Sequence, residues 1–161
     1  METITQKTTI EDANHYCKSL LYLVDSPQHN TIVYTIHGGN FKKNTFENEL
    51  YSYSLELMKT ALYQSSTKYK NPLIQVHIDL KGITMKHIDY NFFKRFIHTF
   101  QSFEDDVLDK LIITNIPIFF KVCYKVLKPF IDKDVRKKIF FEKKKKDKVQ
   151  YVNRDEDLFD E

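Results

Sequence analysis

The chain has no Trp and few of the residues that break or cross-link a fold: Gly 3, Pro 4 and Cys 2 among 161 residues. Cys17 and Cys123 lie far apart and match no metal-binding or redox spacing. A disulfide framework is therefore excluded, and a reducing, intracellular compartment is expected. No Gly-rich phosphate-binding loop exists, because the pair Gly38-Gly39 lacks the Lys and Ser/Thr of a P-loop and predicts a turn.

Long apolar segments and strong charge are also missing. No window approaches the roughly eighteen consecutive apolar residues of a membrane-spanning helix. The first residues carry no basic region followed by an apolar stretch, so no signal peptide is visible. The formal net charge of +3 is too small to favour nucleic acid as a partner. We therefore expect a cytoplasmic protein whose contact with membranes is peripheral.

Catalytic and metal-binding patterns are absent as well. The histidines, His 6 in all, are scattered without the i, i+4 pairing of a helical zinc site. No Gly-x-Ser-x-Gly elbow of a serine hydrolase occurs. We interpret His77, which lies in an expected strand, as a structural histidine. These absences predict a protein that is not an enzyme and that uses no metal and no cofactor.

Aromatic residues are what the chain has in abundance, with Phe 13 and Tyr 10. Short apolar runs bounded by turn residues predict strands at residues 31–36, 73–80, 110–114 and 138–141. Longer segments with apolar residues at i, i+3 and i+4 predict helices at residues 11–24, 44–70, 87–103 and 117–131. Uninterrupted apolar strands that alternate with helices indicate an α/β layered fold with a mostly parallel or mixed sheet.

The length is that of a single domain, and the composition changes near both ends. Residues 1–29 form an N-terminal helical segment that ends in a turn at Asp25–Asn30. Residues 30–141 hold the alternating strands and helices. Residues 142–161 combine a lysine run with an acidic end, a composition typical of a solvated, mobile tail or a loosely docked segment.

Three segments, in this order, carry a resemblance to a known family. A strand ends at Ile78-Asp-Leu-Lys-Gly82, a later strand breaks at Thr114-Asn-Ile-Pro117, and Lys128-Pro-Phe-Ile-Asp132 leads to the strand at Lys138. Over residues 30–141 the chain resembles the CRAL-TRIO family, which carries single lipids in an apolar pocket. It is similar to the lipid-binding lobe of phosphatidylinositol-transfer members, shortened and without the N-terminal helical lobe that usually precedes it.

The resemblance implies a sheet floor with helices around a hydrophobic cavity, closed by a mobile gate helix. The matching gate is residues 118–132, which are apolar over most of the helix circumference and need cover on more than one side. Lipid, a membrane or the protein's own core would each supply that cover. The expected pocket and gate residues are Ile74, Val76, Ile78, Phe96, Phe100, Phe119, Phe120, Tyr124, Leu127, Phe130 and Ile131.

The same resemblance assigns a lipid headgroup to Asp106 and Lys138, where phosphoinositide-binding members place an acid and a lysine. A lysine offers phosphate a point charge, and a carboxylate accepts hydrogen bonds from ring hydroxyls. Lys138 is alternatively one more member of a basic cluster. Ile74 and Val76 stand where this branch places small hydroxyl residues for phosphatidylcholine, which argues against that lipid.

Basic residues follow the expected gate, and we interpret them as a membrane-facing set: Arg136, Lys137, Lys143, Lys144, Lys145 and Lys146. Beside a gate helix they would hold an anionic membrane surface at about 1 kcal/mol per basic residue near the headgroups. The alternatives are a nuclear-localisation or nucleic-acid patch, and a solvated run balanced by the acidic end.

The sequence thus predicts a non-catalytic protein that binds one hydrophobic lipid, such as a phospholipid or phosphoinositide, and carries or presents it at membranes. The alternative is a protein-interaction module whose pocket is filled by its own phenylalanines and whose basic surface binds an acidic partner. A bulkier residue in the pocket would abolish lipid loading only under the first hypothesis.

Overall fold

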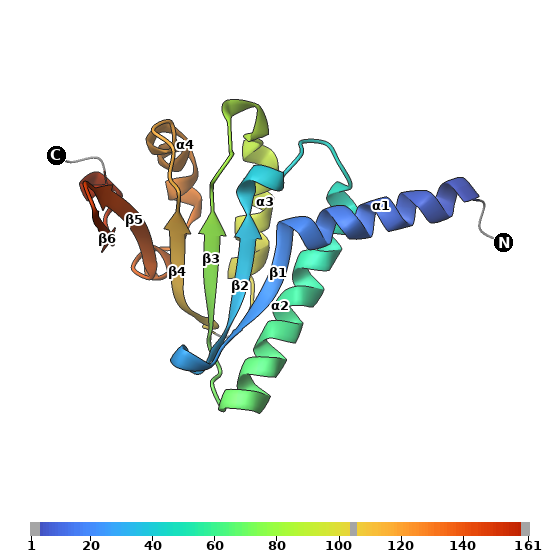
Figure 1. Ribbon diagram of the computed structural model, residues 1–161, viewed down its shortest axis with the longest axis horizontal. Coiled ribbons are helices and arrows are strands. Elements are labelled where there is room, and N and C mark those ends of the chain that lie inside the picture. The colour runs from blue at the N-terminus through green and yellow to red at the C-terminus, as the bar shows by residue number, and fades with distance from the viewer. Residues whose placement is uncertain (1–3, 104–105, 159–161) are drawn as a thin grey trace.

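The computed structural model describes residues 4–103 and 106–158 and shows a mixed sheet with helices packed against it (Figure 1). The strands lie across the sheet in chain order: β1 Leu21–Ser26, β2 Thr31–His37, β3 Ile74–Asp79, β4 Leu108–Thr114, β5 Ile139–Lys145 and β6 Lys148–Val152. Strands β2 to β5 run parallel, while β1 and β6 pair antiparallel at the two edges. The predicted α/β class with a mixed sheet is confirmed.

The helices are α1 Ile4–Leu20, α2 Glu47–Tyr69, α3 Tyr90–Gln101, α4 Phe120–Leu127 and α5 Lys133–Arg136. Three single 3₁₀ turns matter below: η2 Gly38–Asn40, η4 Lys128–Phe130 and η5 Asp155–Asp157. Helices α2, α3 and α4 each connect two adjacent parallel strands, always in the same direction across the sheet. Because such crossovers are right-handed, they place all three helices on one face, and Figure 1 shows α2 and α3 behind the sheet.

Alternation along the strands separates two faces of the sheet. Tyr34 and Ile74 point to the helix-covered face, where they are fully buried against Leu50 and Met58 of α2. Tyr34 donates its hydroxyl to the carbonyl of Ser54 at 3.1 Å, which satisfies the one polar atom of this ring. Burial raises the pKa of Tyr34 far above its ordinary value. The main core therefore lies between α2 and strands β1 to β3.

The predicted helix at residues 11–24 is wrong at its C-terminal end. Helix α1 stops at Leu20, and the following residues form β1, which pairs with β2 through a tight connection at Pro27–His29. Asn30 closes that connection in the left-handed conformation at φ 51°. Leu21 and Leu23 alternate with Tyr22 and Val24, a short apolar run that fits a strand as well as a helix turn. Pairing with β2 decides in favour of the strand.

The tail predicted for residues 142–161 is wrong in its described part. Strand β5 continues through the lysines to Lys145 and turns into β6, and Leu158 is buried beside Phe141. Lysine has a poor strand preference, but pairing to a neighbouring strand overrides it. The helix predicted at residues 117–131 is also shorter, because α4 is followed by η4. Residues 1–3, Glu104 and Asp105 of the acidic break, and residues 159–161 of the acidic end lie outside the described residues.

Gly39 lies where two loops at the carboxyl end of the sheet touch. A Cβ added there would stand 2.2 Å from the carbonyl oxygen of Lys81, a backbone atom that cannot move aside cheaply. We expect Gly39→Ala to lower the free energy of unfolding by about 1–3 kcal/mol, the range for overpacking. Gly38→Ala is the matched control, because its Cβ would meet the movable end of Leu80 at 3.1 Å. Urea unfolding measures both variants, and equal losses of stability would contradict the steric argument.

Candidate functional site

An apolar cavity of about 250 Å³ lies between the helix-covered face of the sheet and helices α3 and α4. Strands β2 to β5 supply its floor through alternate residues: Ile36, Ile78, Leu111, Ile113 and Ile139. Helix α3 supplies one wall through Phe92, Phe93, Phe96 and Ile97. The segment around α4 covers one side of it through Pro117, Phe119, Phe120, Cys123, Tyr124, Leu127 and Ile131. Among the residues that the structure describes, no charged side chain belongs to the lining, so the cavity suits a hydrocarbon ligand.

Most of the expected pocket residues lie at this cavity, and four do not. Ile78, Phe96, Phe119, Phe120, Tyr124, Leu127 and Ile131 are part of its lining. Ile74, Val76 and Phe100 instead belong to the main core, where the Phe100 ring packs edge-on against Tyr34 at 5.6 Å. Phe130 is 48% exposed and lies under the ammonium group of Lys94. The structure places the seven residues in the cavity lining. That they contact a lipid stays a prediction.

Helix α4 and the residues on either side of it carry apolar side chains toward the cavity and also toward solvent. Cys123 and Tyr124 are buried against the cavity, whereas Ile118 and Val122 are 88% and 63% exposed. Val126 and Phe130 continue the exposed set at intervals of four residues, and we call Ile118, Val122, Val126 and Phe130 the outer stripe. Exposed lysines at positions 121 and 125 flank it. A helix that is apolar on its solvent side as well predicts a second apolar environment, such as a membrane surface.

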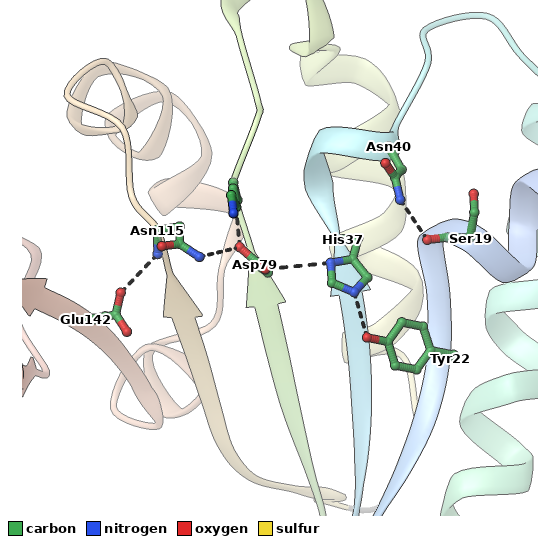
Figure 2. Close-up of polar contacts among 8 residues, drawn as sticks. Ser19, Tyr22, His37, Asn40, Asp79, Asn115 and Glu142 are labelled. Atoms are coloured by element: carbon green, nitrogen blue, oxygen red, sulfur yellow. Dashed lines mark hydrogen bonds and ion pairs between the residues drawn. The ribbon is translucent and has the colours of Figure 1, made fainter.

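A polar row crosses the carboxyl ends of the parallel strands (Figure 2). Tyr22 and His37 share a hydrogen bond of 2.6 Å between the phenol oxygen and Nε2, and His37 Nδ1 lies 3.7 Å from Asp79 Oδ2. Asn115 donates its side-chain amide to Asp79 Oδ1 at 2.8 Å and its backbone N–H to Glu142 at 3.2 Å. The row thus fixes the end of β4, from which the chain continues into α4.

Asp79 and Asn115 belong to two of the three segments that carry the family resemblance, and a hydrogen bond joins them directly. Burial alone would raise the pKa of Asp79, but hydrogen bonds from Asn115 and from the backbone N–H of Lys81 outweigh it and hold that pKa below its ordinary value. Asn115 has a left-handed backbone at φ 53°, which asparagine tolerates better than most residues. The sequence did not reveal Tyr22, His37 or Glu142 as partners, because they come from distant strands.

A second anchor, also missed from the sequence, holds the other end of the segment around α4. Gln101 of α3 donates its amide to the carbonyl of Phe130 at 3.0 Å and accepts the backbone N–H of Asp132 at 2.6 Å. A single side chain therefore bridges both sides of Ile131, a lining residue. Side chains of neighbouring elements thus hold the segment around α4 at both ends, at Asn115 and beside Ile131.

The structure brings together the two residues expected to bind a headgroup. Lys138 donates to the Asp106 carboxylate at 2.6 Å, at the amino ends of β4 and β5 and one residue before the lining residue Ile139. This hydrogen bond holds the pKa of Asp106 below its ordinary value. Asp106 is 71% exposed, so the pair is accessible to a ligand at the surface. Their role in headgroup binding stays a prediction.

The Asp106 pKa gives a test of this pair that needs no lipid. A depressed folded pKa means that the pair stabilises the fold at pH values above the unfolded pKa and that this contribution is lost as the pH falls through the folded pKa. We expect Lys138→Ala to shift the titration of the Asp106 carboxyl group to higher pH. NMR of the side-chain carboxyl carbons measures this titration. Lys137→Ala is the matched control, because Lys137 is the adjacent exposed lysine. An unchanged Asp106 titration in Lys138→Ala would contradict the pairing.

The basic residues interpreted as membrane-facing are divided between different surroundings. Lys143 donates to the carbonyl of Asp157 at 2.6 Å, while Lys144 donates to Asn115 Oδ1 at 3.2 Å. Neighbouring residues of a strand point to opposite faces, so the run Lys143–Lys146 does not present one surface. Arg136 and Lys137 lie at the end of α5, ahead of β5. Contact of this set with a membrane stays a prediction.

Two other features are absent from the described part of the chain, a metal site and a membrane-spanning helix. Within residues 4–103 and 106–158, no group of His, Cys, Asp and Glu side chains is arranged to hold a metal ion. In the same part of the chain, no helix is long and apolar enough to span a bilayer.

Most of the chain matches a known protein family. Residues 14–157 match the family model described as the CRAL/TRIO domain. Among solved structures, the chain is similar to the crystal structure of Sfh5, with a TM-score of 0.69 and 22% sequence identity over 80% of this chain. The match covers 50% of the Sfh5 chain, so the present chain spans about half of its length. No curated protein matches the chain in sequence. The structural likeness concerns the fold alone.

Proposed function

Because the chain belongs to the CRAL/TRIO domain family, whose members bind lipids and other hydrophobic small molecules, we propose that it is a lipid carrier. It takes one lipid into the cavity beneath α4, associates peripherally with membranes and catalyses no reaction. The observation that supports this proposal best is a cavity whose lining, among the described residues, is uncharged, and which is covered on one side by the apolar segment around α4.

The cavity volume bears on how a lipid is held. At about 250 Å³ it lies just below the roughly 300–1,000 Å³ of pockets for drug-sized ligands. It therefore suits a single hydrocarbon chain, and we expect a two-chain phospholipid to require α4 to move outward. Each buried CH₂ gains about 0.8 kcal/mol relative to water, but a bilayer offers the same gain. Extraction is nearly balanced, so contacts to the headgroup select the lipid.

Phosphoinositides are the headgroup class that we propose, with Lys138 contacting phosphate and Asp106 accepting ring hydroxyls. We expect Lys138→Ala to weaken phosphoinositide binding by roughly tenfold or more, the size of a hydrogen bond to a charged group. Lys59→Ala, which removes an exposed lysine of α2 outside the basic set, should bind normally. A lipid-transfer assay with phosphatidylinositol-phosphate vesicles measures both variants, and circular dichroism checks that they are folded. Unchanged transfer by Lys138→Ala would overturn the headgroup assignment.

The competing function is a protein-interaction module, and one observation favours it. Aromatic rings crowd one end of the cavity, where Phe41 lies 5.2 Å from Phe92 and 5.3 Å from Phe93 between ring centroids. Under this alternative the phenylalanines of α3 fill the space that a lipid would occupy, and a basic surface binds an acidic protein.

Native mass spectrometry of the purified protein, with lipid analysis of any extracted ligand, separates the two functions. A lipid at one equivalent per chain supports the carrier and identifies the lipid class. A protein that is empty, and that also takes up nothing from phosphatidylcholine, phosphatidylserine or phosphatidylinositol vesicles, contradicts the carrier.

A further inference from the structure

A short acidic segment of the C-terminal part contacts the helix that closes the cavity. We call residues Arg154–Leu158 the strap; it contains η5 and follows β6. Lys128, directly after α4, donates to Asp155 Oδ1 at 2.8 Å and to Glu156 Oε1 at 3.4 Å. Two carboxylates of the strap thus share one ammonium group at the end of the gate.

The strap is also held against the sheet, so it connects the gate to strand β5. Leu158 is 6% exposed and belongs to the same buried cluster as Phe141 of β5 and Tyr124 of α4. Lys143 of β5 donates to the carbonyl of Asp157 at 2.6 Å. An outward movement of α4 must therefore separate Lys128 from the strap or pull the strap off the sheet.

The pKa shifts of Lys128 and Tyr124 are those expected beside the carboxylates of the strap. The hydrogen bond to Asp155 raises the pKa of Lys128. Burial, and then the neighbouring Asp155 carboxylate, raise the pKa of Tyr124 to about 12. The Lys128 side chain is 30% exposed and that of Asp155 is 28% exposed, so the pair is only partly screened by water.

Lys128 follows the exposed residues Lys121 and Lys125 at helical spacing, on the side of the helix that flanks the outer stripe. A surface that receives the stripe and this row of lysines therefore comes close to Lys128. If that surface is anionic, it offers Lys128 new partners and repels Asp155 and Glu156. Surface ion pairs and lysines at an anionic bilayer gain similar free energies, so lipid headgroups can replace the strap.

We propose that the strap is an autoinhibitory latch, which keeps α4 closed over the cavity in solution and releases it where an anionic membrane binds Lys128. The proposal rests on the lipid-carrier function and adds a trigger to it: the charge of the membrane decides where the lipid is exchanged.

The test compares the double variant Asp155→Asn/Glu156→Gln with Glu56→Gln as the matched control. Glu56 forms an exposed ion pair with Lys59 at 3.4 Å on α2, away from the gate. Transfer of a fluorescent phospholipid is measured with neutral phosphatidylcholine vesicles and with vesicles that also contain phosphatidylserine. We expect the double variant to transfer roughly threefold to fivefold faster than wild type with neutral vesicles, the equivalent of losing one surface ion pair. Its rate ratio between anionic and neutral vesicles should fall toward one.

Hydrogen exchange of the α4 amides, without lipid, provides a second measurement that does not depend on carrier function. We expect faster exchange in the double variant and an unchanged rate in Glu56→Gln. If wild type transfers no lipid, the carrier function fails while the exchange data still test the latch. If wild type transfers lipid and the double variant matches it in both transfer and exchange, the latch is overturned.

Discussion

Leu111→Trp is expected to abolish lipid loading, whereas Ile112→Trp leaves loading unchanged. The two residues are neighbours on β4, where successive side chains point to opposite faces of the sheet. Leu111 lines the cavity floor, and Ile112 lies outside the lining. An indole in a cavity of about 250 Å³ removes the space for a hydrocarbon chain. The expected result is a loss of co-purified lipid from about one equivalent to less than roughly a tenth.

The comparison separates a lost cavity from a damaged fold. Both substitutions enlarge a half-buried strand residue, and overpacking costs about 1–3 kcal/mol. Thermal unfolding should therefore show similar losses for the two variants, while native mass spectrometry shows lipid only in Ile112→Trp. Full lipid content in a folded Leu111→Trp protein would mean that the lipid binds elsewhere. If neither variant nor wild type contains lipid, the filled, protein-binding module gains support.

The strands of the parallel sheet could be predicted because each is a short apolar run between breaking residues. The edge strands could not. Leu21–Ser26 gives the same local signal as one more helix turn, and Lys148–Val152 follows a lysine run that has a poor strand preference. Both become strands through pairing with a neighbour, a contact that no local pattern contains. The same reason explains why the lysine run divides between two faces.

The candidate site was predictable where a motif carried it, and otherwise not. The apolar faces of α3 and α4 follow from helical spacing, and the pairing of Asp106 with Lys138 follows from their positions in the motif order. Ile74 was expected at the cavity but lies in the core, because α2 packs over that end of β3. Gln101 carries no signal in the sequence. Gln101 becomes an anchor only because residues 130–132 pass beside it in the folded chain.

The outer stripe gives the second prediction: Ile118→Asp/Val122→Asp should lose vesicle binding while keeping its lipid. These side chains are 88% and 63% exposed and point away from the cavity, so their loss leaves the lining intact. Burial of an aliphatic side chain in a membrane is worth about 1.5 kcal/mol or more. Removing two of them predicts roughly a hundredfold weaker partitioning into vesicles. Acidic residues near the start of α4 are compatible with the helix dipole, so the fold should be retained.

Tyr63→Asp is the matched control for this pair of substitutions, because Tyr63 is 71% exposed on α2, outside the gate. Vesicle flotation measures membrane binding, and native mass spectrometry measures the lipid that is still carried. A stripe variant that holds lipid but no longer floats would assign membrane contact to the same helix that closes the cavity. Outward movement of α4 would then be coupled to membrane binding. The outer face of α4 gains apolar cover only at a membrane, and a membrane is also where the inner face can release a lipid. Equal flotation of the stripe variant and Tyr63→Asp would place the membrane contact elsewhere on the protein.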